Sequence, residues 1–109
     1  MTFHGASAHM TVHISPENVP RFLELFRPVF EKVTQEPECI FLQLFQSPDD
    51  PGTISWVENW SKPKEWFMEH QMSKSYYDEY RAETSKMYLK PIEVRVFDLM
   101  GPEYTFVRA

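Results

Sequence analysis

The order of two hydrophobic periodicities limits the fold of this chain more than any other feature of its sequence. In residues 7–14 and 53–60, apolar side chains recur at every second position, which is typical of a strand with one buried face. In residues 19–33 they recur every three or four positions, which is typical of an amphipathic helix. The chain therefore alternates strands and helices whose apolar faces must cover one another.

The remaining segments extend this pattern. Residues 39–46 predict a strand with apolar side chains on both faces, which indicates that both faces are covered. A turn rich in Pro, Asp and Gly joins this strand to residues 53–60, so the two strands are predicted to form an antiparallel hairpin. Residues 62–88 predict a second helix in two segments with a restart near Ser73, and residues 92–99 predict the last strand.

Prolines mark the first helix at two places. Ser15 followed by Pro16 predicts a helix start, and Asn18 is the alternative N-cap because Pro20 fits a first helical turn. Pro28 lies inside the same helix and removes one backbone hydrogen bond. We therefore expect a kink at this position.

The resulting order, β-α-β-β-α-β, predicts an α+β ferredoxin-like fold with a four-stranded antiparallel sheet and both helices on one face. We expect one domain over residues 1–109, with a core of about 7–100 and a short tail of 101–109. The strands carry apolar residues on both sides, so the face without helices is predicted to be an association surface. A symmetric homodimer that packs sheet against sheet is the expected assembly.

Composition excludes several classes of protein. The 11 basic and 16 acidic residues give a net charge of −5, which argues against a nucleic-acid surface. The three widely spaced glycines cannot form a phosphate-binding glycine loop. The single cysteine, Cys39, fits a reducing compartment. No secretory signal or membrane span is found, so the expected location is cytoplasmic.

Residues 37–60, PECIFLQLFQSPDDPGTISWVENW, resemble the middle of antibiotic-biosynthesis-monooxygenase (ABM) domains. Those domains have an extended strand, an acidic turn and a strand that ends in Glu-x-Trp, which is Glu58-Asn59-Trp60 here. Their second helix usually carries a histidine soon afterwards, and His70 lies ten residues after Trp60. The resemblance covers about residues 7–100.

This resemblance implies a dimeric α/β barrel. It also implies, for some members, oxygenation of phenolic polyketides without metal, flavin or haem, in which the deprotonated substrate passes an electron to dioxygen. The expected activity is thus a cofactor-independent monooxygenase or oxidase acting on a hydrophobic phenolic, quinol or polyketide-like molecule. Other members oxidise quinols, degrade haem or are stress proteins. The histidine that binds haem iron in the haem-degrading members falls near Tyr80 here, which argues against haem.

Two titratable residues are the candidate catalytic groups. His70 is a candidate base, because an imidazole can accept a proton near neutral pH and its spacing from Trp66 and Phe67 places it on the sheet-facing side of the helix. The alternative is a structural histidine bonded to a backbone carbonyl or to Glu58. Glu58 lies on an aromatic strand face, where it could orient His70, receive a substrate proton or simply pair with an Arg or a backbone amide.

An excess of aromatic residues surrounds these two groups. Six of them are predicted to line a pocket for a flat aromatic molecule, with plain core packing as the alternative: Trp56, Trp60, Trp66, Phe67, Tyr77 and Tyr80. His9 and His13 lie about 13 Å apart along a strand, too far to share one zinc ion. No metal site is therefore expected, although His13 could reach a cavity by itself.

Two other functions remain open at this level, and a third is excluded. A non-catalytic or stress-responsive binder of small hydrophobic molecules fits the same scaffold. So does a cyclase, decarboxylase or isomerase that performs no redox step. An RNA-recognition module shares the order of elements but needs glycine and basic residues on its third strand, which residues 53–60 lack.

Overall fold

The computed structural model describes residues 5–109. Residues 1–4, part of the N-terminal stretch in which we predict no secretory signal, lie outside the described residues. The strands are β1 (Ala6–His13), β2 (Cys39–Gln46), β3 (Thr53–Trp60) and β4 (Glu93–Asp98). The helices are α1 (Val19–Gln35), α2 (Lys64–Trp66) and α3 (Asp78–Thr84). Within residues 5–109, no helix has the length and apolar character needed to cross a lipid bilayer.

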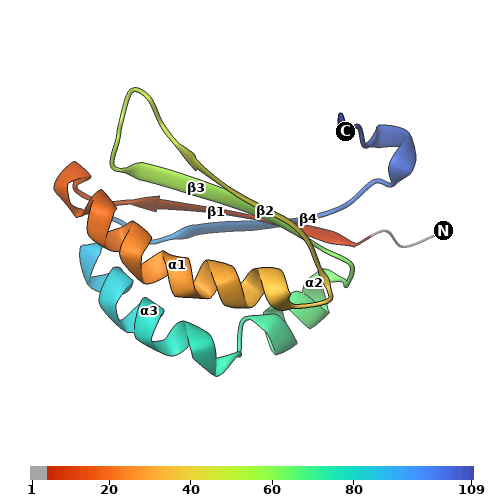
Figure 1. Cartoon of the computed structure of the whole chain (residues 1–109), viewed down its shortest axis with the longest axis horizontal. Coiled ribbons are helices and arrows are strands. Elements are labelled where there is room, and N and C mark those ends of the chain that lie inside the picture. The colour runs from red at the N-terminus through yellow and green to blue at the C-terminus, as the bar shows by residue number, and fades with distance from the viewer. Residues whose placement is uncertain (1–4) are drawn as a thin grey trace.

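The four strands form one antiparallel sheet in the order β2-β3-β1-β4. Helices α1, α2 and α3 lie on the same side of this sheet, as Figure 1 shows. This is the predicted ferredoxin-like α+β arrangement, and the hairpin of β2 and β3 is confirmed. At the centre of the sheet, Met10 of β1 stands between Trp56 of β3 and Val94 of β4.

The main core lies between the sheet and α1. On β1 and β3, buried side chains alternate with more exposed ones, which confirms the period-two prediction. The buried face of α1 consists of Phe22, Phe26, Val29 and Val33. A 3₁₀ turn over Pro16–Asn18 precedes α1, so Ser15 and Asn18 each precede a helical segment, and neither side chain makes a capping hydrogen bond. Helix α1 continues without interruption through Pro28, where the sequence predicts a kink.

The second helical region is divided, as the sequence predicts, but it contains a π-helix that the sequence does not reveal. After α2, residues Phe67–Gln71 form this π-helix, in which the Met72 amide donates to the Phe67 carbonyl at 2.9 Å. The chain then restarts with a 3₁₀ turn at Ser75–Tyr77 and continues as α3 and a second 3₁₀ turn at Ser85–Met87. The wider turn of a π-helix changes which residues face the sheet.

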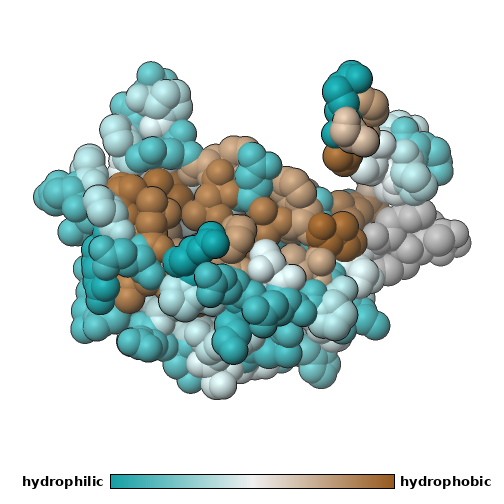
Figure 2. All heavy atoms as spheres, viewed as in Figure 1, coloured by the Kyte–Doolittle hydropathy of each residue, from teal (hydrophilic) through white to brown (hydrophobic). Residues whose placement is uncertain are grey.

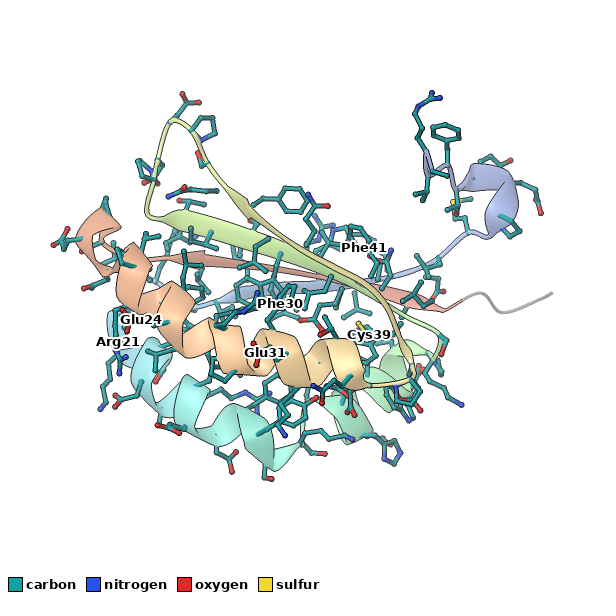
Figure 3. All side chains as sticks on the ribbon, viewed as in Figure 1. Arg21, Glu24, Phe30, Glu31, Cys39 and Phe41 are labelled. Carbon is teal, nitrogen blue, oxygen red and sulfur yellow. The ribbon has the colours of Figure 1, made fainter. Side chains whose placement is uncertain are left out.

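The sheet face opposite the helices, here called the open face, is uncovered in the single chain. We predicted that both faces of β2 are covered, and this is wrong for one chain: Phe41 and Phe45 are 41% and 47% exposed. Phe41 lies on the side of the sheet away from the helices (Figure 3). Figure 2 shows hydrophobic residues gathered along the sheet, above the hydrophilic surface of the helices. The prediction fails because helices α1, α2 and α3 cover only one face of the sheet and leave the other face of β2 exposed.

Candidate active site

A cavity of about 320 Å³ lies between the helix-covered face of the sheet and the helices α1 and α3. Its sheet side is formed by Met10, Trp56 and Glu58, and its α1 side by Phe26, Val29 and Val33. Tyr77, Tyr80 and Arg81 come from the second helical region. The volume and the mostly apolar wall are typical of a site for a small organic molecule.

Among the described residues, Glu58 is the only acidic one in the cavity wall. It is 3% exposed, and its two carboxyl oxygens accept hydrogen bonds from two indoles: Trp56 Nε1 donates to Oε2 at 3.0 Å and Trp60 Nε1 donates to Oε1 at 3.1 Å. Burial raises the pKa of Glu58 to about 7, although the two indole hydrogen bonds act to lower it. The alternation of β3 places all three side chains on the same face.

This arrangement gives the cavity a proton acceptor matched to neutral pH. A carboxylate in water is too weak a base to take a proton from a phenol or an activated carbon, whereas one with a pKa near 7 exchanges protons efficiently at that pH. The two indoles hold the carboxylate in one orientation on the cavity wall. Glu58 is thus positioned by tryptophans, and not by an Arg, a backbone amide or His70, which were the partners considered from the sequence.

A buried amide fixes the tyrosine side of the cavity. Gln71 is fully buried, and its Nε2 donates to the hydroxyls of Tyr77 at 2.8 Å and Tyr76 at 2.6 Å. The Tyr76 hydroxyl in turn donates to Glu36 Oε2 at 3.3 Å, which links the π-helix to the residue that follows α1. Because its hydroxyl is held by Gln71, the Tyr77 ring keeps a defined place in the cavity wall.

Tyr80 differs from Tyr77 in its hydrogen bonding. It is 8% exposed, its ring packs against Phe22 and Phe26, and its hydroxyl is buried without a hydrogen-bond partner among the described residues. Burial raises the pKa of Tyr80, with Tyr88 adding to the effect, so the phenol remains protonated at neutral pH.

The cavity opens between α3 and the segment that enters β4. Four of its lining residues are exposed, which marks them as the mouth: Arg81, Ser85, Ile92 and Val94. Tyr77, Arg81 and Ser85 follow one another at four-residue steps, so they lie along one helix face that extends from the cavity wall to the surface.

His70 does not lie where the sequence predicts. It is exposed and is not part of the cavity wall, while its neighbour Gln71 is fully buried. In a regular α-helix, His70 and Gln71 would both lie near Phe67 on the buried face, but the wider turn of the π-helix rotates His70 away from the sheet and leaves Gln71 buried. The His70 ring stands 6.1 Å from the Trp66 ring, and its carbonyl accepts a hydrogen bond from Ser73.

The six predicted pocket aromatics divide into two groups. Trp56, Tyr77 and Tyr80 line the cavity. The other three form a separate packed cluster beside it, in which the Trp60 ring lies 5.8 Å from each of its two neighbours: Trp66 and Phe67. Trp60 still contributes to the site, because its indole binds Glu58.

The two strand histidines lie on the open face and bind separate partners. His13 Nε2 is 2.6 Å from Glu93 Oε2, and its Nδ1 is 3.2 Å from Thr53 Oγ1. His9 Nε2 is 2.8 Å from Ser7 Oγ, and its ring stacks near Phe97. His13, predicted to reach a cavity, is not in the wall of this one, because β1 directs it away from the helices. Among residues 5–109, no three His, Cys, Asp or Glu side chains are grouped to hold a metal ion.

Sequence reasoning overlooked the residues that complete the site. Arg81, Ser85 and Tyr88 were not proposed, nor was Gln71 behind Tyr77. The four-residue spacing from Tyr77 was a usable signal for Arg81 and Ser85. Gln71 lies four residues after Phe67, so the same spacing was a signal for its burial, whereas the exposure of His70 depends on the π-helix.

Residues 6–82 match the family model of the antibiotic biosynthesis monooxygenases, so the chain belongs to this family and its fold is that of an ABM domain. A protein of Pestalotiopsis microspora named "putative monooxygenase" is 34% identical over 96 residues, which are 88% of this chain and 80% of that protein.

Solved structures agree on the fold. A "putative antibiotic biosynthesis monooxygenase" of Nitrosomonas europaea superimposes with a TM-score of 0.81 at 18% identity, over 94% of this chain and 96% of that chain. A conserved protein of Methanosarcina mazei Go1 gives 0.78 at 19% identity, over 87% and 92%. At these identities the likeness shows the fold alone, and the family membership rests on the sequence matches.

Proposed function

We propose that this protein is a cofactor-independent monooxygenase that oxidises a hydrophobic phenolic, quinol or polyketide-like molecule in the cavity beside Glu58. The observation that carries the proposal is a buried carboxylate with a pKa of about 7 in the wall of a mostly apolar cavity. Family membership and the Pestalotiopsis relative support a monooxygenase-type reaction.

Glu58 acts as the base in this proposal. Its carboxylate removes a proton from the activated carbon or hydroxyl of the bound substrate, and the resulting anion is delocalised over the aromatic rings. The cavity excludes water from this anion, which favours its reaction with dioxygen over simple reprotonation. Trp56, Tyr77 and Tyr80 supply aromatic surface against which a flat substrate can stack.

The reaction balances without an added reductant. The substrate anion transfers one electron to dioxygen, and the substrate radical and superoxide then combine to form a carbon–oxygen bond. Protonation by Glu58 gives a hydroperoxide. Loss of water breaks the oxygen–oxygen bond and removes the second hydrogen of the carbon, so that a CH₂ group and dioxygen become a carbonyl group and water.

Oxygen consumption tests the proposal directly. Purified protein freed of metal by a chelator is incubated with anthrone, a tricyclic molecule with an acidic CH₂ group, and dissolved oxygen and product mass are followed. We expect oxygen uptake above the uncatalysed rate and a product that has gained one oxygen and lost two hydrogens. Tight binding without oxygen uptake for anthrone and for a panel of quinols would contradict the proposal and favour a hydrophobic-ligand binder. A product formed without added oxygen would favour the non-redox enzymes.

We also propose that the open face is covered by a second copy of the chain. Phe41, Phe45 and Phe97 are each more than 40% exposed there, which is unusual for aromatic side chains on one face of a small domain. Sedimentation should show a dimer, and Phe45→Asp should shift the protein toward monomer. A monomeric wild-type protein at high concentration would contradict this assembly.

A further inference from the structure

Arg81 at the cavity mouth has an unusual environment for an arginine on a helix surface. Its guanidinium carbon lies 4.5 Å above the centre of the Tyr77 ring, and Nη2 lies 3.6 Å from the Met72 sulfur. Tyr77 and Met72 both belong to the cavity wall. The positive charge of Arg81 is therefore held at the cavity mouth by contacts with two residues of the cavity wall.

The two arginines of α1 each form an ion pair within their own helix, whereas Arg81 does not. Arg21 pairs with Glu24 three residues later at 3.2 Å, and Arg27 pairs with Glu31 four residues later at 3.4 Å. Asp78 stands three residues before Arg81 on α3, but no ion pair joins them, and no carboxylate among residues 5–109 lies within 4.0 Å of the guanidinium. The fork of N–H donors at the mouth thus keeps its capacity to bind an anion.

We propose that Arg81 binds a carboxylate carried by the substrate, so that the molecule taken by this cavity is an aromatic acid whose ring enters first and whose carboxylate stays at the mouth. This inference rests on the proposed function, because it assumes an aromatic substrate beside Glu58. A planar guanidinium binds a carboxylate through two parallel hydrogen bonds, which fixes orientation as well as adding affinity.

The charges of the cavity support one orientation. The inner end carries the Glu58 carboxyl group, which repels a second carboxylate once it is ionised, and the rest of the inner wall is mostly apolar. An anion at that end would lose its hydration without compensation, whereas at the mouth it keeps contact with solvent and gains Arg81. The reacting ring is thereby directed toward Glu58.

Binding of two matched probes tests this inference without turnover. Anaerobic calorimetry compares 6-hydroxy-2-naphthoate with 2-naphthol, which has the same rings and hydroxyl but no carboxylate. We expect wild-type protein to bind the naphthoate more tightly, Arg81→Gln to lose about tenfold in naphthoate affinity with naphthol affinity unchanged, and Arg81→Lys to recover part of the loss. Added salt should weaken naphthoate binding in the wild type and much less in Arg81→Gln.

Arg27→Gln is the matched control, because Arg27 also stacks on an aromatic ring, Phe30 at 5.1 Å, but lies outside the cavity wall. It should leave both affinities unchanged. Equal binding of the two probes by the wild type, or an equal loss of naphthoate affinity in Arg27→Gln, would overturn the role of Arg81. Neither result bears on the proposed oxidation, which the oxygen assay tests separately. That assay can fail even if the protein binds the naphthoate more tightly than the naphthol.

Discussion

The two faces of the sheet each carry a hydrogen-bonded glutamate, Glu58 on the helix side and Glu93 on the open side. Glu58 is buried and receives two indole hydrogen bonds, and burial raises its pKa to about 7. Glu93 is exposed, and its hydrogen bond to His13 lowers its pKa. The same residue type on one sheet is thus a base suited to neutral pH on one face and a persistent anion on the other. Desolvation makes the difference.

The aromatic residues of the two faces differ in the same way. On the helix side, Trp56 and Trp60 are at most 4% exposed and hold the carboxylate between them. On the open side, Phe41, Phe45 and Phe97 point outward, and among the described residues only Phe97 is seen beside charged or titratable side chains, the ring of His9 and the guanidinium of Arg95. The aromatic side chains enclosed between the sheet and the helices thus form part of the candidate active site, whereas the exposed aromatic side chains of the open face are suited to association.

The largest expected effect comes from removing the base. Glu58→Gln keeps the size of the side chain but cannot accept a proton, so turnover of anthrone should fall by about 10²–10⁴-fold. Glu93→Gln changes the same residue type on the open face and should leave turnover within about twofold. Wild-type kcat/KM should rise with pH and level off above about 7, as the Glu58 carboxylate forms. Full activity of Glu58→Gln would show that another group is the base.

Core and open-face phenylalanines provide the second test. Phe22 is fully buried under α1, so Phe22→Ala should lower the free energy of unfolding by about 3–5 kcal/mol. Phe41→Ala on the open face should cost less than about 1 kcal/mol in dilute solution, because the side chain is already partly solvated. Urea unfolding at several protein concentrations measures both. A cost for Phe41→Ala that grows with concentration would add support for a dimer through this face.

Glu58 and Glu93 should change the stability of the protein with pH in opposite directions. The folded-state pKa of Glu58 lies above its ordinary value of 4.5, so the folded protein binds this proton more tightly than the unfolded chain. Its contribution to stability is present at acid pH and is lost between about pH 4.5 and 7, on the order of 3 kcal/mol. The pKa of Glu93 is lowered in the folded protein, so its contribution to stability runs in the opposite direction and is lost as pH falls.

The free energies of unfolding of the wild-type and Glu58→Gln proteins should therefore approach each other as pH rises. At pH 5 the variant should be less stable by about 1–3 kcal/mol, because its amide can accept from one indole only. At pH 8 the wild type has lost its advantage from the bound proton, so the difference should shrink. Urea titrations at both pH values measure it, and a difference that is constant with pH would contradict the raised pKa.

The fold could be predicted from the sequence because each strand and helix carries its own periodicity. The alternation in residues 53–60 placed Glu58 on the aromatic, buried face, and the spacing of Phe22 and Phe26 identified the buried side of α1. These features depend only on which neighbours along the chain share a face.

The parts of the site that could not be predicted depend on irregular backbone or on contacts distant in sequence. His70 was assigned to the buried face by counting α-helical turns, but the wider turn of the π-helix rotates His70 away from the sheet while Gln71 stays buried. Indole donors for Glu58 were overlooked because residues two apart on a strand are usually treated as neighbours on a face and not as hydrogen-bond partners. The four-residue spacing from Tyr77 indicates the helix face of Arg81, but its place at the mouth depends on where α3 lies beside the segment that enters β4, which no local pattern records.

The smallest expected effect distinguishes two tyrosines within the helix-side cavity. Tyr80→Phe removes a buried hydroxyl that has no partner among the described residues, so the folded state loses a desolvation cost and no hydrogen bond. Its free energy of unfolding should be unchanged or higher by up to about 1 kcal/mol. Tyr77→Phe, the matched control, leaves one N–H of buried Gln71 unpaired and should be destabilising by about 1 kcal/mol. Thermal and urea unfolding measure both variants. A clear destabilisation of Tyr80→Phe would mean that its hydroxyl has a partner, such as bound water, which would then stand in the cavity where a substrate oxygen could replace it.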